Sequence, residues 1–187
     1  MERQKIIIGI TGTLGAGKGT VVEYLKKKSF KHYSVREFLI KEIKRQGMPV
    51  NRDSMVEVAN DLRKKFGPGY TAIELYKQAI KESDRAIVES IRTVGEVEAL
   101  RKKGDFYLFA VEAKAELRYE RIRKRNNETD QRTFEDFMAD EKREMKFSDP
   151  AKQNLKKCIE MADFKFDNSG TLKDLEKQVQ DVLREIE

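Results

Sequence analysis

A chain of 187 residues is long enough for one domain with a substantial hydrophobic core and leaves little room for a second. Charged and hydrophobic residues each make up 39% of the sequence, so a densely charged surface must surround that core. The one cysteine, Cys158, excludes an internal disulfide, and the one histidine, His32, excludes a site with several histidine ligands. We interpret both as structural residues.

The net charge of +6 does not by itself indicate nucleic acid. Acidic residues lie near almost every Lys or Arg, and only Lys26-Lys27-Lys28 forms a basic block. This pattern favours a positive field that suits small polyphosphates, so we expect no nucleic-acid partner. The apolar run Ile6–Ile10 is too short for a signal peptide or a membrane span, and we expect a cytoplasmic protein, monomeric or homodimeric, with no membrane partner.

The first predicted elements are an apolar strand at Lys5–Ile10, a glycine-rich loop and a helix at Val21–Lys28. Strand, glycine loop and helix form the context of a phosphate-binding loop. Glycines let the backbone curl so that several N–H groups face one anion, and the start of the helix adds its positive dipole end. Lys18 supplies a charge for the outer phosphates of ATP, and Thr20 supplies a hydroxyl for Mg²⁺. The residues expected to bind ATP are Gly12, Thr13, Leu14, Gly15, Ala16, Gly17, Lys18, Gly19 and Thr20.

A second strand is predicted at Phe30–Ser34, with Ser34 capping a helix and Glu37 completing a capping box. Two more helical patterns follow before the third strand, Arg85–Glu89. That strand delivers Glu89-Ser90-Ile91-Arg92-Thr93 at its carboxyl end, where open parallel sheets bind ligands.

The second half of the chain continues to alternate between strands and helices. This alternation predicts a three-layer α/β domain with a parallel sheet and right-handed crossovers. The predicted strands are 106–111 and 164–167, and the predicted helices are 94–103, 114–125, 133–147, 154–161 and the last one, from 172 onward.

Several of these segments resemble nucleoside monophosphate kinases. Gly15-Ala16-Gly17-Lys18-Gly19-Thr20 is similar to the adenylate kinase loop, which also carries Gly between Lys and Thr. The segment 32–39 is similar to their acceptor-nucleotide segment, and 89–93 resembles their Asp-Gly-Phe-Pro-Arg-Thr. Arg121, Arg125 and Arg132 resemble their lid arginines. The chain as a whole resembles an adenylate-kinase-related group of P-loop kinases from archaea and bacteria, sometimes labelled dephospho-CoA kinases.

The resemblance implies one P-loop kinase domain over residues 1–187. Its five-stranded parallel sheet would have the order 2-3-1-4-5, with an acceptor-binding helical region at about 34–83 and a short helical lid at about 121–147. It implies ATP- and Mg²⁺-dependent phosphoryl transfer to a nucleoside monophosphate such as AMP. The implied catalytic residues are Lys18, Arg92, Arg125 and Arg132; further ATP contacts are Arg121, Asn168 and Gly170; acceptor contacts are Ser34, Arg36, Glu37 and Arg92; and metal contacts are Thr20 and Glu89.

Two departures bear on the acceptor. Adenylate kinases usually carry an acceptor-phosphate Arg where this chain has Ile40, and Arg36 begins the same helix and can substitute. Dephospho-CoA kinases carry Asp-x-Asp where this chain reads Ser34-Val35-Arg36, and a basic residue there favours an acceptor that is already a phosphate. Glu37 is the one base left for a hydroxyl acceptor.

Alternatives stay open. The protein could be a dephospho-CoA kinase or another small-molecule kinase with a hydroxyl acceptor, a nucleotide-binding sensor with little turnover, or an RNA-associated protein, a reading that rests only on its charge. Arg92 could form a surface ion pair with Glu96, Glu89 could cap a loop, and the basic helix could simply be solvated.

Overall fold

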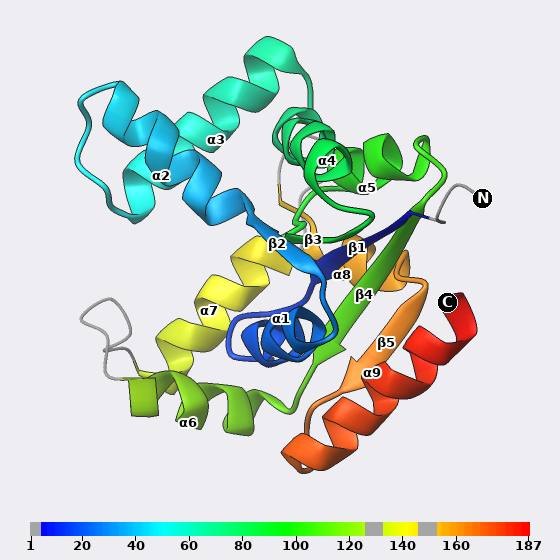
Figure 1. Cartoon of the computed structure of the whole chain (residues 1–187). Helices are drawn as coiled ribbons and strands as arrows, with labels where there is room; N and C mark the ends of the chain where they lie inside the picture. Colours follow the sequence, from blue (N-terminus) through cyan, green and yellow to red (C-terminus); the bar gives the residue numbers. More distant parts are fainter. Residues whose placement is uncertain (1–4, 126–132, 146–152) are drawn as a thin grey trace.

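The computed structural model describes residues 5–125, 133–145 and 153–187, and it confirms a parallel five-stranded sheet in the order β2-β3-β1-β4-β5. Helices pack on both faces of this sheet (Figure 1). The strands are β1 (Ile6–Thr11), β2 (Lys31–Ser34), β3 (Arg85–Glu89), β4 (Phe106–Glu112) and β5 (Phe164–Asp167).

Helices fill the connections between the strands. The predicted bounds agree with the observed ones to within a few residues. The helices are α1 (Lys18–Lys27), α2 (Val35–Arg45), α3 (Arg52–Phe66), α4 (Tyr70–Glu82), α5 (Val94–Arg101), α6 (Ala115–Arg125), α7 (Phe134–Met145), α8 (Leu155–Glu160) and α9 (Leu172–Ile186).

Strand β1 is central because both of its faces are apolar. All six of its residues are buried, and successive side chains enter opposite layers of the core. Ile7 packs among residues of α2, α3, α4, α5 and α8. Ile6, Ile8 and Ile10 pack among residues of α1 and α9. The result is the three-layer domain that the alternation of elements predicts.

Local signals set the helix starts. The Ser34 hydroxyl accepts a hydrogen bond from the backbone N–H of Glu37, at 3.3 Å, as the capping pattern predicts. Thr93 and Glu96 form a complete capping box at the start of α5.

Cys158 is fully buried, and burial raises the pKa of its thiol to about 12, in agreement with its structural interpretation.

The register of the sheet brings three strand ends together. Ile10 of β1 pairs with Glu89 of β3, and Ser34 of β2 pairs with the same Glu89. Because the strands are parallel, the loop after β1 and the segments after β2 and β3 leave the sheet at one edge. Helices α6 and α7 lie at this edge, on the side of the molecule away from both termini (Figure 1).

Candidate phosphotransfer site

The phosphate loop has the curled backbone that its glycines predict. Gly12, Gly15 and Gly17 have φ angles of 137°, 78° and 101°, a region that other residues rarely adopt. A Cβ at Gly12 would lie 2.2 Å from the carbonyl oxygen of Val111, and one at Gly17 would lie 2.0 Å from Nδ2 of Asn168. Glycine is therefore required both for the turns and for close packing against the neighbouring segments.

Helix α1 starts directly after Gly17 and carries the two predicted side chains in its first turn. Lys18 Nζ donates to the carbonyl oxygens of Gly12 and Thr13, at 2.8 and 2.9 Å, so its ammonium group lies at the loop. Thr20 lies two residues further along and is partly exposed. The positive end of the helix, the loop amides and the Lys18 charge together favour a bound anion.

Two residues predicted to contact ATP meet each other behind the loop. Asn168 follows β5, and its side-chain amide donates to the carbonyl of Ala16, at 2.8 Å. Arg121 on α6 donates through Nη2 to the backbone carbonyl of Asn168, also at 2.8 Å. The structure thus brings Asn168 to the loop through its side chain, and Arg121 contacts Asn168 rather than the loop itself. Gly170 lies in the following turn and is exposed.

Arg118 is a site residue that sequence reasoning missed. Its side chain is buried and donates through Nη1 to the carbonyl of Leu14, at 3.3 Å. It also pairs with Glu141 on α7. The predicted basic stripe on α6 included Arg121 and Arg125 and omitted Arg118, although the spacing i, i+3 and i+7 places all three on the same side of the helix. A buried arginine cannot be distinguished from a solvated one by spacing alone.

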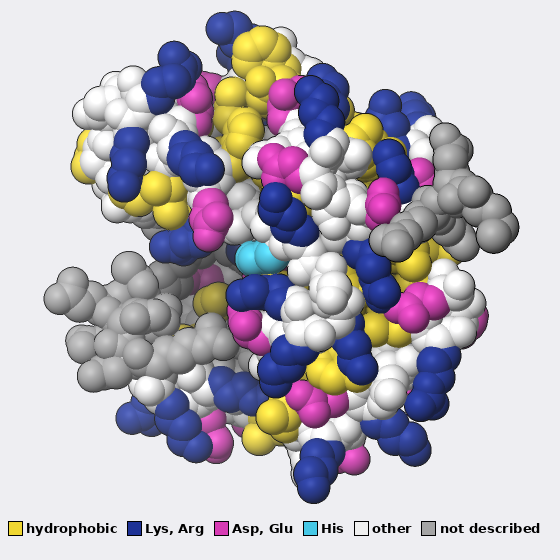
Figure 2. Space-filling view, viewed as in Figure 1, with side chains coloured by type: hydrophobic (Ala, Val, Ile, Leu, Met, Phe, Trp, Pro, Cys, Tyr) yellow, Lys and Arg dark blue, Asp and Glu magenta, His cyan; other side chains and the backbone are white. Residues whose placement is uncertain are grey.

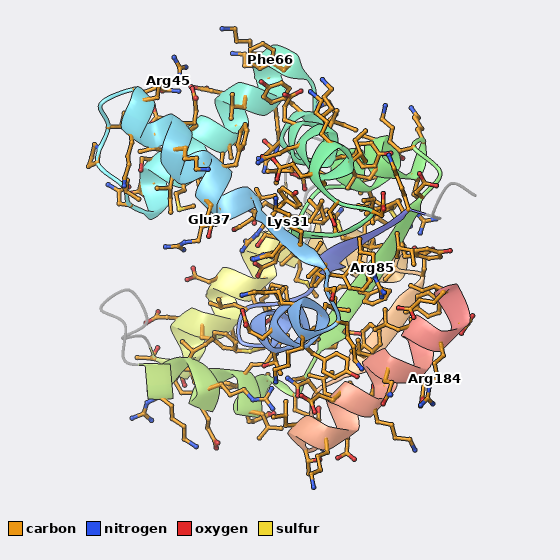
Figure 3. All side chains as sticks on the ribbon, in the orientation of Figure 1. Lys31, Glu37, Arg45, Phe66, Arg85 and Arg184 are labelled. Carbon is orange, nitrogen blue, oxygen red and sulfur yellow. The ribbon has the colours of Figure 1, made fainter. Side chains whose placement is uncertain are left out.

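The segment after β2 carries the predicted acceptor residues. Ser34 is buried, and its hydroxyl caps α2. Arg36 and Glu37 are exposed on the first turn of α2. Figure 3 labels Glu37 at this end of the helix. These two side chains are accessible to a ligand, whereas the Ser34 hydroxyl already has a partner.

Glu89, at the end of β3, interacts with His32 and with the charges of Lys18 and Arg92. It forms a hydrogen bond with His32, at 3.0 Å between Oε2 and Nε2, and both side chains are about one-fifth exposed. This bond lowers the pKa of Glu89 more strongly than burial raises it, and the charges of Lys18 and Arg92 lower the pKa further. Glu89 is therefore ionised, and it interacts electrostatically with Lys18 and Arg92, two of the four predicted catalytic cations.

His32, a residue of β2 that we interpret as structural, forms its side-chain bond with a predicted site residue, Glu89. Figure 2 shows this one histidine, in cyan, on the surface between basic side chains. Both His32 and Glu89 lie on the face of the sheet that carries Ile87. No local sequence signal connects residues 32 and 89, because only the pairing of β2 with β3 brings them together.

Arg92 does not form the surface ion pair with Glu96 that was the alternative to a functional role. Glu96 accepts instead from the backbone N–H groups of Arg92 and Thr93, at 2.8 and 3.0 Å. The Arg92 side chain is partly exposed, and its Nη1 donates to Gln153, at 3.4 Å. The turn before it is unusual, since Ser90 has a φ of 72°. Its backbone is thus fixed at the strand end, and its side chain is partly exposed.

The residues present fit a magnesium ion that accompanies a nucleotide. Mg²⁺ favours one or two oxygen ligands from the protein together with phosphate oxygens and water. The Thr20 hydroxyl and the ionised Glu89 carboxylate are hard oxygen donors of this kind. Within the described residues there is no cluster of three or more His, Cys, Asp or Glu side chains that would hold a metal without the nucleotide.

Part of the predicted lid lies outside the described residues. This applies to Arg132 and to the side chain of Arg125. The described part of the 121–147 region consists of the end of α6 and helix α7, with the Thr133 hydroxyl accepting from the N–H of Asp136 at the start of α7. No helix among the described residues is long and apolar enough to cross a membrane.

Known proteins share this architecture. A family model described as an AAA domain matches residues 8–149. The chain is 32% identical to a UPF0200 protein of Methanocaldococcus jannaschii, over 97% of this chain and 90% of that protein. Among solved structures, it is similar to a Thermus thermophilus protein with a TM-score of 0.61 and 23% identity, covering 99% of this chain and 100% of that one. It is also similar to the dephospho-CoA kinase of Campylobacter jejuni, with a TM-score of 0.55 and 18% identity, covering 98% of each chain.

The fold and the loop together define a P-loop protein with the architecture of the P-loop kinases. Within that class, the chain belongs to the UPF0200 family and carries the AAA domain that the family model describes. The narrower resemblance to adenylate-kinase-related enzymes remains a prediction.

Proposed function

We propose that this protein is an ATP- and Mg²⁺-dependent phosphotransferase that acts on a small phosphorylated acceptor, a nucleoside monophosphate such as AMP. One observation carries the proposal: the loop with Lys18 and the segment with Arg92 leave the adjacent parallel strands β1 and β3 at the same edge of the sheet, and the charges of both side chains lower the pKa of Glu89. A protein that only binds a nucleotide needs the phosphate loop and Lys18, but no second cation for an acceptor. A phosphotransferase needs both, because charge on the moving phosphoryl group must be neutralised along its whole path.

In this proposal the phosphate loop and Lys18 bind the donor triphosphate. Mg²⁺, bound through Thr20 and Glu89, would neutralise charge on the donor phosphates. Arg92 and Arg36 hold the acceptor phosphate, and Arg121, Arg125 and Arg132 contact the donor from the lid region. A phosphate oxygen of the acceptor forms the new bond to the terminal phosphorus of ATP, and the bond from that phosphorus to ADP breaks.

The basic residue Arg36 supports the choice of a phosphorylated acceptor. It is exposed on the first turn of α2, next to the buried end of β2. A guanidinium can bind a phosphate through two parallel hydrogen bonds, whereas it offers nothing as a base to a hydroxyl acceptor. Glu37 is exposed beside it and could orient the rest of the acceptor.

A hydroxyl acceptor is the second candidate, and the His32–Glu89 pair favours it. A histidine that is oriented by a carboxylate is a suitable base for the proton of a hydroxyl group, whereas Glu89 itself, with its lowered pKa, is a weak base. The proton would pass to His32 while the hydroxyl oxygen forms its bond to the terminal phosphorus and the bond from that phosphorus to ADP breaks. Dephospho-CoA kinase is the name of one structural neighbour, which makes dephospho-CoA a reasonable test substrate for this candidate.

A panel of acceptors separates the two candidates. The protein is incubated with ATP labelled on its terminal phosphate, with Mg²⁺ and one acceptor at a time, and the labelled products are separated. We expect label on AMP or another nucleoside monophosphate. Label only on adenosine or dephospho-CoA would favour the hydroxyl acceptor, and ATP binding without transfer to any acceptor would favour a sensor.

A further inference from the structure

Arg118 makes an unusual set of contacts for a residue on a basic helix. Its Nε donates to the carbonyl of Ala113, at 2.9 Å, and its Nη1 to the carbonyl of Leu14, at 3.3 Å. Both terminal nitrogens contact Glu141 on α7, with Nη2 at 3.0 Å from Oε1. The guanidinium also lies over the ring of Phe137, 5.2 Å from its centroid. One buried side chain therefore joins the phosphate loop to two helices.

The contact with Leu14 fixes the direction of a peptide group in the loop. In a trans peptide the carbonyl and the following N–H point in opposite directions, and the described residues contain no cis peptide. Because Arg118 holds the Leu14 carbonyl, the N–H of Gly15 points away from Arg118. Loop amides that point into the loop are the groups that bind phosphate.

A second carbonyl of the loop is held in the same way. Asn168 binds the carbonyl of Ala16, which directs the N–H of Gly17 to the opposite side. Arg121 in turn holds Asn168 by its backbone carbonyl. Two alternate peptide groups of the loop are thus oriented by side chains from the second half of the chain.

Arg118 is not placed to bind phosphate itself. Its side chain is 6% exposed, and its charge is paired with that of Glu141. A buried arginine paired with a carboxylate presents little net charge to a ligand. Arg118 contacts the loop through the backbone carbonyl of Leu14. Any effect of Arg118 on phosphate binding must therefore come from the conformation of the loop backbone.

We propose that Arg118 is a positioning residue, which orients the Leu14–Gly15 peptide for phosphate binding and is itself held by Glu141 and Phe137 on α7. Phosphate affinity then depends on α7 being docked against α6. This inference rests on the proposed function only in requiring that the loop binds ATP. It requires no particular acceptor.

The test is the affinity for ATP with Mg²⁺, measured by calorimetry on the full chain, beside the urea midpoint of each variant. Arg118→Ala should weaken ATP binding about tenfold, the effect of losing one hydrogen bond to a charged group. Arg118→Lys should recover part of that loss, because an ammonium group can still donate to the Leu14 carbonyl. Glu141→Gln should weaken binding about threefold, because Arg118 loses its ionic partner.

Arg101→Ala is the matched control. Arg101 also donates to a carbonyl, that of Met161, and pairs with a carboxylate, Asp163, at 2.8 Å, but it lies on α5 away from the loop. Its variant should bind ATP as the unmodified protein does, even if its urea midpoint falls.

The outcomes are distinguishable. Arg118→Ala and Glu141→Gln variants that are folded and bind ATP within twofold of the unmodified protein would overturn the positioning role, whatever their urea midpoints. If Arg118→Ala does not fold, Glu141→Gln and Arg118→Lys decide by the same criterion. If the unmodified protein binds no ATP, the proposed function fails and this inference fails with it.

Discussion

The donor and acceptor sides of the candidate site are built in different ways. The donor side consists mostly of consecutive backbone groups, 12–20, whose shape depends on glycine and on packing from behind. The proposed acceptor side consists of side chains from β2, from the start of α2 and from the segment that follows β3. Backbone groups at a helix start can bind almost any polyphosphate, whereas separate side chains can change one at a time. Under the proposed function, specificity for the acceptor should therefore reside in Arg36, Glu37 and Arg92.

The largest effect is expected on the donor side, from Lys18→Ala. Removing the charge at the loop should lower phosphoryl transfer by about a thousandfold, as loss of a key electrostatic group does in other enzymes. The urea midpoint should change little, because Lys18 is partly exposed. Transfer of labelled phosphate measures the effect. Lys26→Ala, which removes an exposed ion pair with Glu23, is the control and should retain full activity.

Glu89→Gln tests the role of the Glu89 charge, which interacts with Lys18 on the donor side and with Arg92 on the acceptor side. Its expected effect is a loss of transfer of about a hundredfold, because the variant lacks the charge between Lys18 and Arg92. Steady-state kinetics with varied Mg²⁺ should show a raised requirement for the metal. Unchanged kinetics in this variant would remove Glu89 from the site.

The same residue makes a prediction about pH. The pKa of Glu89 is lowered in the folded protein from its ordinary value of 4.5, so the carboxylate stabilises the fold above that value. This stabilisation is lost as the pH falls below 4.5 and through the lowered pKa of the folded state. Urea midpoints of the unmodified protein should fall more steeply with acid than those of Glu89→Gln. Parallel curves for the two proteins would contradict the His32–Glu89 bond.

Gly17→Ala changes only the backbone of the phosphate loop, and we expect a smaller effect than the losses of transfer predicted for Lys18→Ala and Glu89→Gln. A Cβ there would collide with Asn168, and φ is positive, so we expect a loss of stability of about 1–3 kcal/mol and weaker ATP binding. Gly19→Ala is the matched control for stability. Nothing lies within 4 Å of a Cβ at that position inside α1, so the variant should be as stable or slightly more stable. Urea denaturation of the pair distinguishes the two.

The smallest effect is expected from Arg36→Ala on the acceptor side. Arg36 is exposed and shares the acceptor with Arg92, so the KM for the acceptor should rise by about tenfold or less. The KM for ATP should stay the same. An equal change in both values would place Arg36 outside the acceptor site. Lys41→Ala, another exposed cation on α2, is a suitable control.

Sequence patterns predicted the parts of the molecule that depend on neighbours in the chain. The apolar run of β1, the glycines of the loop and the cap at Ser34 are local signals, and the structure confirms them. The strand order followed from the family resemblance, and it too is confirmed.

Contacts between distant residues could not be predicted in this way. His32 meets Glu89 across 57 positions of sequence, and Arg118 meets Leu14 across 104. Neither pair has a spacing or composition that marks it, because each depends on how whole elements pack. The roles assigned to Arg36, Arg92 and Arg125 stay predictions for the same reason.

The central claim is that one site holds a donor and an acceptor phosphate together. A crystal structure with a bisubstrate analogue, two nucleosides joined by a chain of phosphates, tests it most directly. We predict that Lys18 and the loop contact one end of the phosphate chain and that Arg36 and Arg92 contact the other. An analogue bound through the loop alone, with both arginines turned away from its phosphates, would contradict this account.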